Sequence, residues 1–112
     1  MNTSDRELLE LAAKAAGLEL TYCESWCCMA KKLADLDGEY FDSKTCWNPL
    51  TYDGDALRLA VNLRISVSIG KDVVEAYIGQ SDGKLEVSKS NLLSATRLAI
   101  VRAAAEIGKA VK

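Results

Sequence analysis

The side chains with the clearest chemical potential in this chain are its four thiols: Cys23, Cys27, Cys28 and Cys46. Four thiolates can hold a structural zinc ion, and any two thiols that meet can form a disulfide. Zinc sites usually separate paired ligands by two residues, whereas Cys27 and Cys28 are adjacent and would point to opposite faces of a strand. This spacing favours reduced thiols without metal and leaves zinc and a disulfide as the alternatives.

The two tryptophans lie next to these thiols. Trp26 precedes Cys27 and Trp47 follows Cys46, which suggests that the two regions meet in the fold. A redox role would need a thiolate stabilised by nearby positive charge. Lysines close in sequence could supply that charge, namely Lys31, Lys32 and Lys44.

Other catalytic chemistry finds little support. The chain has no histidine, which removes the commonest general base, the usual partner of a nucleophilic serine or cysteine, and the commonest metal ligand. No glycine-rich phosphate loop is present. Asp53 and Asp55 form a pair of carboxylates, but together with Thr51 they stand at a predicted helix start, where they are expected to cap the helix. We therefore predict no catalytic residue, no cofactor and no enzymatic activity.

An acidic run over residues 35–42 superficially resembles a calcium loop. Its glycine, Gly38, comes fourth instead of sixth, and no glutamate stands at the twelfth position. The pair Asp37-Gly38 is typical of a two-residue hairpin turn. The run is therefore interpreted as the tip of a hairpin.

Charge divides the chain into an acidic and a basic half. Residues 1–56 contain eleven acidic and five basic residues, and residues 57–112 contain five acidic and nine basic residues. This asymmetry is interpreted as two solvated surfaces that differ in sign, and the alternative is a dipolar molecule that self-associates head to tail or docks one charged face on a partner. Nucleic-acid binding is the alternative for the basic half. Its contacts would be Arg58, Arg64, Arg97 and Arg102.

Protein contact is the preferred interpretation of the first half. Its candidate binding residues combine aromatic, amide and acidic side chains: Trp26, Trp47, Asn48, Tyr52, Asp37 and Glu39. The segment 23–46, with its thiols and acids, is the expected contact surface.

These residues must be positioned by three predicted helices. Residues 4–17 begin with a capping box of Ser4 and Glu7 and end at Gly17. A second helix covers 55–63, and a third runs from Ser90 or Asn91 to about residue 110. Helical spacing predicts the buried face of the second helix as Ala56, Leu57, Ala60 and Val61. For the third helix it predicts Leu93, Thr96, Ile100, Ala103, Ala104, Ile107 and Val111.

The remaining segments alternate or carry turn signals. Residues 18–22 are predicted as a strand, and residues 23–46 as an extended ribbon with a turn at Asp37-Gly38 and a loop over 42–46. Strands are expected at 65–69, 72–78 and about 85–87. A turn at Gly70-Lys71 and a hairpin signal at 81–84 separate them.

The expected architecture is one α+β domain spanning residues 1–112, with an antiparallel sheet of about four to five strands and three helices in the order α-β(β)-α-β-β-β-α. The alanines of the third helix would pack on its own sheet or, alternatively, form the contact of a homodimer. No segment has the length of apolar sequence that a membrane span needs. The first ten residues lack the pattern of a secretory signal, so a cytoplasmic location with reduced thiols is expected.

Three blocks of the chain carry a resemblance: residues 5–17, residues 47–61 and residues 95–108. Together they resemble a family of small accessory proteins encoded by tailed bacteriophages and prophages, which is similar to the phage α-β-α sandwich domain. The resemblance implies a phage accessory protein in the host cytoplasm, and it transfers no activity or catalytic residue to this chain. With the missing catalytic groups, it favours non-catalytic binding to a host or phage protein, which would counter a host defence. The alternative is a nucleic-acid-binding regulator.

Overall fold

The computed structural model describes residues 4–33, 40–71, 73–78, 84–87 and 91–111. In this part of the chain, three helices are separated by two groups of three strands. Their order is α1 (Asp5–Ala16), β1 (Thr21–Cys23), β2 (Cys28–Leu33), β3 (Tyr40–Trp47), α2 (Asp53–Leu63), β4 (Ile65–Ile69), β5 (Val74–Ile78), β6 (Lys84–Val87) and α3 (Leu92–Ala110). The α+β class and the predicted order of helices and strands are confirmed.

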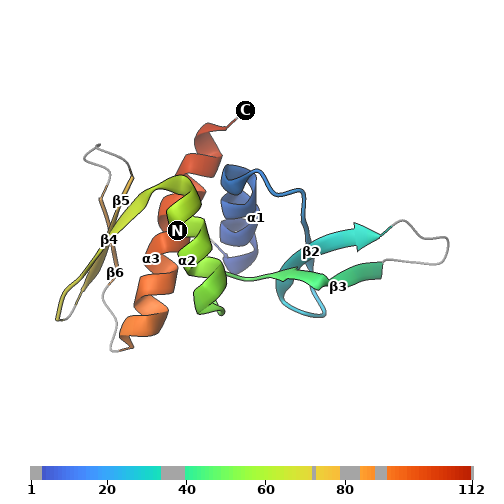
Figure 1. Ribbon diagram of the computed structural model, residues 1–112, viewed down its shortest axis with the longest axis horizontal. Helices are drawn as coiled ribbons and strands as arrows, with labels where there is room; N and C mark the ends of the chain where they lie inside the picture. The colour runs from blue at the N-terminus through green and yellow to red at the C-terminus, as the bar shows by residue number, and fades with distance from the viewer. Residues whose placement is uncertain (1–3, 34–39, 72, 79–83, 88–90, 112) are drawn as a thin grey trace.

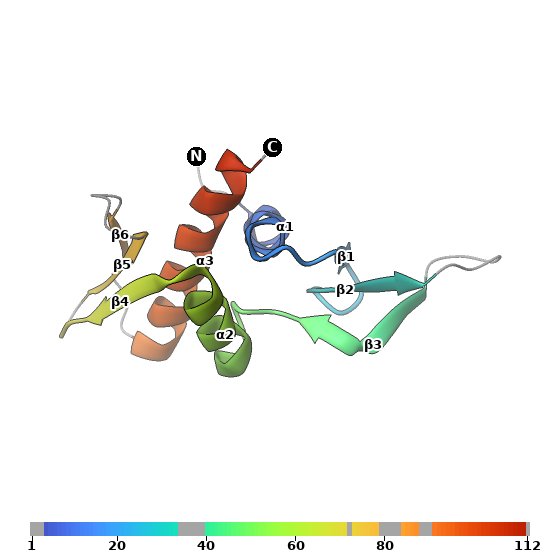
Figure 2. The same cartoon turned by 45° about the horizontal axis from the view of Figure 1, so that its top comes forward.

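The strands form two separate antiparallel sheets of three strands each, β1-β2-β3 and β4-β5-β6. Figures 1 and 2 show α3 in the middle, with the second sheet on one side of it and α1 on the other. The first sheet projects beyond α1, and its antiparallel strands β2 and β3 are called the long hairpin below. A single larger sheet was the sequence expectation, and the helices that lie between the two sheets keep them apart.

Helix α3 is the element on which the others pack. It contacts α1, α2 and all three strands of the second sheet. Its buried side is lined by small residues: Ala95, Ala99, Ala103, Ala104, Ala105 and Gly108. Small side chains allow neighbouring backbones to approach closely, and Gly108 lies directly against the backbone of Leu11 in α1. The alanine stripe therefore packs within its own chain, on the sheet as well as on α1.

Two apolar clusters make up the core. The larger one lies where α1, α2 and α3 meet the second sheet, and the smaller one contains Leu9, Ala13 and Met29. Trp47 and Leu50 pack against both clusters. These two residues therefore join the hairpin to the main body.

Local signals explain the ends of the helices. The Ser4 hydroxyl accepts a hydrogen bond from the backbone N–H of Glu7, and Gly17 adopts the left-handed conformation with φ 74°. At the start of α3, the Asn91 side chain accepts from the N–H of Ser94. The Ser4 bond of the predicted capping box and the Gly17 C-cap are thus confirmed, and Asn91, one of the two predicted start residues of α3, is its N-cap.

The predicted caps of α2 are wrong. Tyr52 is its N-cap residue, and within the described ranges its side chain makes no capping hydrogen bond. The N–H groups of Thr51 and Tyr52 instead donate to the carbonyl oxygen of Asn48. Asp55 is buried and its carboxylate has other partners, while Asp53 forms an ion pair with Arg97.

The faces of two helices also differ from the prediction. In α2 the buried side chains are Asp55, Ala56, Leu59 and Ala60, so Leu57 and Val61 lie in solvent. In α3 the predicted core residue Leu93 is exposed. The buried face of α2 is therefore rotated from the predicted one, and it includes Asp55, whose carboxylate accepts from the N–H of Asn48 and from Arg58.

Residues 42–46 were predicted as a loop and belong to β3 instead. The register between β2 and β3 shifts between Met29 and Lys31, which is a bulge. At the bulge, Thr45 Oγ1 accepts from the N–H of Lys31 and donates to the carbonyl oxygen of Asp42. Because a bulge interrupts the alternation of inward and outward side chains, residues 42–46 do not show the alternating pattern from which a strand is predicted.

The turn signals have mixed outcomes. Gly70 donates its N–H to the carbonyl oxygen of Val73, so a turn joins β4 to β5 as predicted. The first predicted strand is shorter than expected and begins at Thr21. The signals at Asp37-Gly38 and at 81–84 lie outside the described residues, except that Lys84 begins β6.

Candidate protein-binding groove

The connection between α2 and β4 brings helix and strand side by side. Arg64 alone separates them, and it takes the left-handed conformation with φ 56°. Its N–H bonds back to the carbonyl oxygens at the end of α2. Since a single left-handed residue reverses the chain here, β4 returns next to α2 without an intervening loop.

An open groove of about 550 Å³ lies between α2 and β4. Ile100 and Thr96 of α3 line it together with residues of both flanking elements. A second hollow of about 300 Å³ continues it toward the first turn of α3. The two hollows share Leu57, Ile69, Thr96 and Ile100, so they form one continuous surface, called the α2–β4 groove below.

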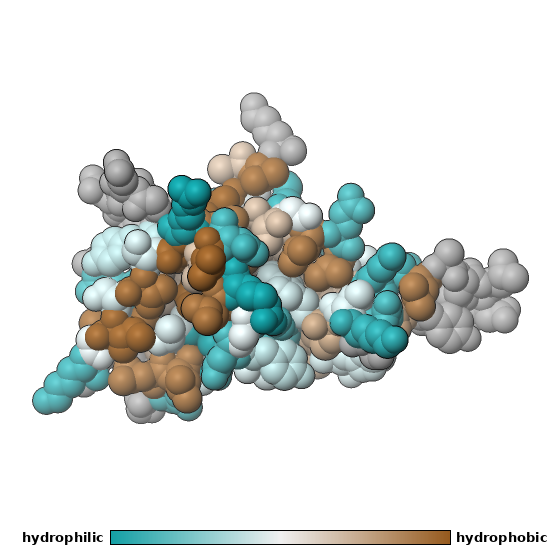
Figure 3. All heavy atoms as spheres, viewed as in Figure 1, coloured by the Kyte–Doolittle hydropathy of each residue, from teal (hydrophilic) through white to brown (hydrophobic). Residues whose placement is uncertain are grey.

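Four large apolar side chains around this groove are mostly in solvent. Leu57 and Val61 are 64% and 66% exposed, and Ile69 and Leu93 are 60% and 64% exposed. Single exposed apolar residues are ordinary on protein surfaces, whereas a group around one hollow marks an interaction site. Figure 3 shows apolar side chains gathered over the half of the molecule that carries α2 and β4.

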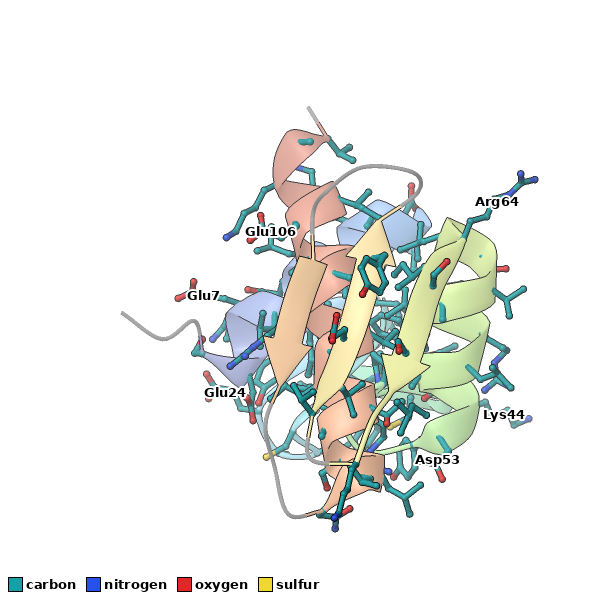
Figure 4. All side chains as sticks on the ribbon, turned by 90° about the vertical axis from the view of Figure 1, so that its left-hand side faces the viewer. Glu7, Glu24, Lys44, Asp53, Arg64 and Glu106 are labelled. Carbon is teal, nitrogen blue, oxygen red and sulfur yellow. The ribbon has the colours of Figure 1, made fainter. Side chains whose placement is uncertain are left out.

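The two ends of the groove differ in charge. Arg64 lines one end and extends into solvent, as Figure 4 shows. Within the part of the chain that the structure describes, no acidic side chain pairs with Arg64. At the other end Arg97 is fully engaged: it forms an ion pair with Asp53 and donates to the carbonyl oxygen of Leu50 at 2.9 Å. The free positive charge therefore lies at the Arg64 end.

Two of the residues predicted to bind a partner, Asn48 and Trp47, make contacts within the fold. Asn48 is buried, and its N–H donates to Asp55 Oδ2 at 2.9 Å. Its side-chain amide donates to the carbonyl oxygen of Cys27 at 2.9 Å, and its Oδ1 accepts from the N–H of Leu50 at 3.0 Å. Trp47 packs between the two apolar clusters.

The other predicted contacts are dispersed. Trp26 is 45% exposed and its ring lies 6.1 Å from that of Phe41, at a polar hollow on the first sheet. Tyr52 is 53% exposed at the start of α2. Asp37 and Glu39 lie outside the described residues. The structure therefore does not place Trp26 or Tyr52 in the lining of the α2–β4 groove.

The arginines proposed for nucleic-acid contact have different surroundings. Arg58 forms an ion pair with Asp55 at 2.7 Å, and Arg97 is occupied as described. Arg102 lies half-buried on α3, while Arg64 extends from the end of α2. Two of the four guanidinium groups thus have internal carboxylate partners.

The predicted meeting of the two cysteine regions is confirmed. Cys28 Sγ lies 2.7 Å from Cys46 Sγ, and all four cysteines are free thiols. Burial raises the pKa of the Cys28 thiol to about 12, and hydrogen bonding with Cys46 adds to this rise. No three potential metal ligands are grouped in the described ranges.

Sequence reasoning missed the α2–β4 groove because it assigned its walls to the core. One signal was available: apolar residues cover more than one face of α2, at positions 56, 57, 59, 60, 61 and 63. A helix with such a broad apolar surface is either completely enclosed or leaves part of that surface in solvent. A domain of this size has few elements with which to enclose it.

None of the helices in the described ranges has both the length and the apolar character needed to cross a membrane. Comparison of the chain with models of protein families, with curated proteins and with solved structures finds no match.

Proposed function

We propose that this chain is a non-catalytic binding protein that receives an amphipathic helix of another protein in the α2–β4 groove. The observation that carries the proposal is the group of four exposed apolar side chains around one groove: Leu57, Val61, Ile69 and Leu93. Burying such side chains against a partner removes apolar surface from water, which is the main favourable term in association.

The dimensions and the charge of the groove support one kind of partner in this proposal. The five residues of β4 span about 16 Å, which corresponds to about three turns of a helix. Arg64 lies at one end and has no acidic partner among the residues that the structure describes, which favours an acidic residue at the matching end of that helix. The partner is therefore a helix with an apolar stripe and an acidic terminus.

The resemblance of three sequence blocks to phage accessory proteins suggests where such a partner would come from. On this proposal it is a host or phage protein in the host cytoplasm, and its capture would counter a host defence. A nucleic-acid-binding regulator remains the competing function, and it predicts binding that falls steeply with salt.

A model peptide of about fourteen residues with a leucine stripe can test the groove, in one version with a glutamate terminus and in another with a lysine terminus. We expect the glutamate version to bind more tightly, as measured by fluorescence anisotropy. Leu57→Asp should weaken binding by about tenfold or more, since one buried leucine contributes about 1.5–3 kcal/mol. Leu33→Asp is the matched control, because Leu33 is an exposed leucine on β2, outside the groove.

The proposal fails if neither peptide binds, or if Leu57→Asp and Leu33→Asp weaken binding equally. If native mass spectrometry showed that the free protein is a dimer that Leu57→Asp converts to a monomer, the occupant of the groove would be a second copy and the proposed partner would be overturned. A DNA or RNA complex would favour the nucleic-acid-binding regulator instead, if it dissociates at physiological salt and depends on Arg64 but not on Leu57.

A further inference from the structure

The contact between Cys28 and Cys46 joins two strands at the base of the long hairpin. Cys28 begins β2 and is buried, while Cys46 is the second-last residue of β3 and is partly exposed. Their sulfur atoms are 2.7 Å apart. A disulfide bond is about 2.05 Å long, so the sulfurs need to approach by less than about 1 Å to form one.

The backbone around the pair explains why these two thiols meet. Met29 lies opposite Trp47, which would place Cys28 opposite Asn48 and leave Cys46 two residues away along β3, on the diagonal of the same face. The bulge begins at this point, between Met29 and Lys31. Because bulges increase the local twist of a strand, they can bring diagonal side chains closer together.

The other two thiols are less well placed. Cys23 is the cross-strand neighbour of Cys28 on β1 and is buried. Cys27 is exposed, and its thiol is 3.5 Å from the carbonyl oxygen of Glu24. Cys46 thus combines contact with Cys28 and access to solvent.

We propose that Cys28 and Cys46 form an oxidisable dithiol, a modification site that reacts with a low-molecular-weight disulfide such as oxidised glutathione. The thiolate of Cys46 attacks one sulfur of the reagent, which forms a mixed disulfide and releases the first reduced thiol. Cys28 then gives up its proton and attacks Cys46 Sγ, which releases the second reduced thiol. Two protein thiols are oxidised, one reagent disulfide is reduced, and the two protons leave on the released thiols.

The order of these steps follows from burial. Cys46 reaches solvent and meets the reagent first, whereas the buried Cys28 is protonated at neutral pH and acts only as the resolving thiol. The product would tie β2 to β3 next to Trp47, where the hairpin joins the main body. This proposal does not depend on the α2–β4 groove or on its partner.

The test treats the full chain with oxidised glutathione, blocks the remaining thiols by alkylation and maps the linked peptides by mass spectrometry. We expect the wild type to lose two hydrogen masses and to yield a peptide pair linked through Cys28 and Cys46. Reduction with dithiothreitol should reverse the loss. Cys46→Ser should yield no link at Cys28, whereas Cys27→Ser should yield the same link as the wild type.

Three results would overturn the proposal. One is a dominant link between Cys23 and Cys28, and another is an adduct on Cys27 alone with Cys28 and Cys46 still open to alkylation. The third is a linked product that forms only in urea. The decisive mapping is done on the wild type, so a poorly folded Cys46→Ser variant does not remove the test, and Cys46→Ala serves as a second variant.

Discussion

Gly108→Ala is expected to destabilise the fold, because α3 and α1 approach most closely at this residue. A Cβ atom at position 108 would lie 2.1 Å from the carbonyl oxygen of Leu11 and 2.8 Å from its carbonyl carbon. Ordinary contact begins at 3.4 Å, so the two helices must separate by about 1 Å at this point. The obstacle is backbone and cannot rotate away as a side chain can.

The magnitude follows from two opposing terms. Inserting a methyl group into a well-packed interface costs about 1–3 kcal/mol, and alanine recovers up to about 1 kcal/mol over glycine through its helix propensity. Gly108 lies in the last turn of α3, where that recovery is smaller. We expect a net loss of about 1–2 kcal/mol, or a fall in Tm of roughly 4–10 °C.

The assay is urea unfolding followed by circular dichroism, with thermal melting as a second measurement. Gly54→Ala is the matched control, since a Cβ at that position meets only the side chain of Arg58 at 3.4 Å. The control should leave the midpoint unchanged or raise it slightly. If Gly108→Ala were as stable as the wild type, with the same dependence on urea, the close crossing of α1 and α3 would be refuted.

Four further predictions concern buried or engaged polar groups. Asp55→Asn should lower the free energy of unfolding by about 1–2 kcal/mol in urea, because the carboxylate accepts from Asn48 and Arg58. Arg58→Ala should cost less than about 1 kcal/mol, since that side chain is 70% exposed, and equal costs would contradict the structure. Arg97→Lys should lower Tm by several degrees, because lysine cannot serve Asp53, Leu50 and Ser94 together as the guanidinium does. An unchanged Tm would show that these three contacts of Arg97 do not stabilise the fold. The raised pKa of Cys28, about 12 against an ordinary 9.0, means that the folded state holds this proton more tightly. Stability under reducing conditions should therefore fall as pH rises from about 9 toward 12, and Cys28→Ser should flatten this part of the curve measured by urea unfolding.

The parts of the fold that sequence could predict are those with local signals. Ser4 with Glu7 and Gly17 mark the ends of α1 because their side-chain or backbone chemistry acts within one turn. Gly70 marks its turn in the same way. These residues need no distant partner, so their roles can be derived from neighbours in the sequence.

The parts that sequence could not predict depend on distant contacts. Asp55 looked like a helix cap, but the N–H of Asn48 reaches its carboxylate and makes it a buried acceptor. Leu57 and Val61 had the spacing of a core face, and only the assembled fold shows that no described element covers them. The division of the strands into two sheets likewise follows from where the helices pack.

The central position of α3 has a consequence for the order of events during synthesis. Its contacts are with α1, α2 and the second sheet, and the ribosome makes all of these before it reaches residue 92. At about 5–20 residues per second, the 19 residues of α3 take roughly 1–4 s to appear. During that interval the earlier elements expose the apolar faces that α3 will cover. We therefore expect the core around α3 to be completed only after this helix has been made, and a chain that stops before residue 92 to lack the surface on which α1, α2 and the second sheet pack.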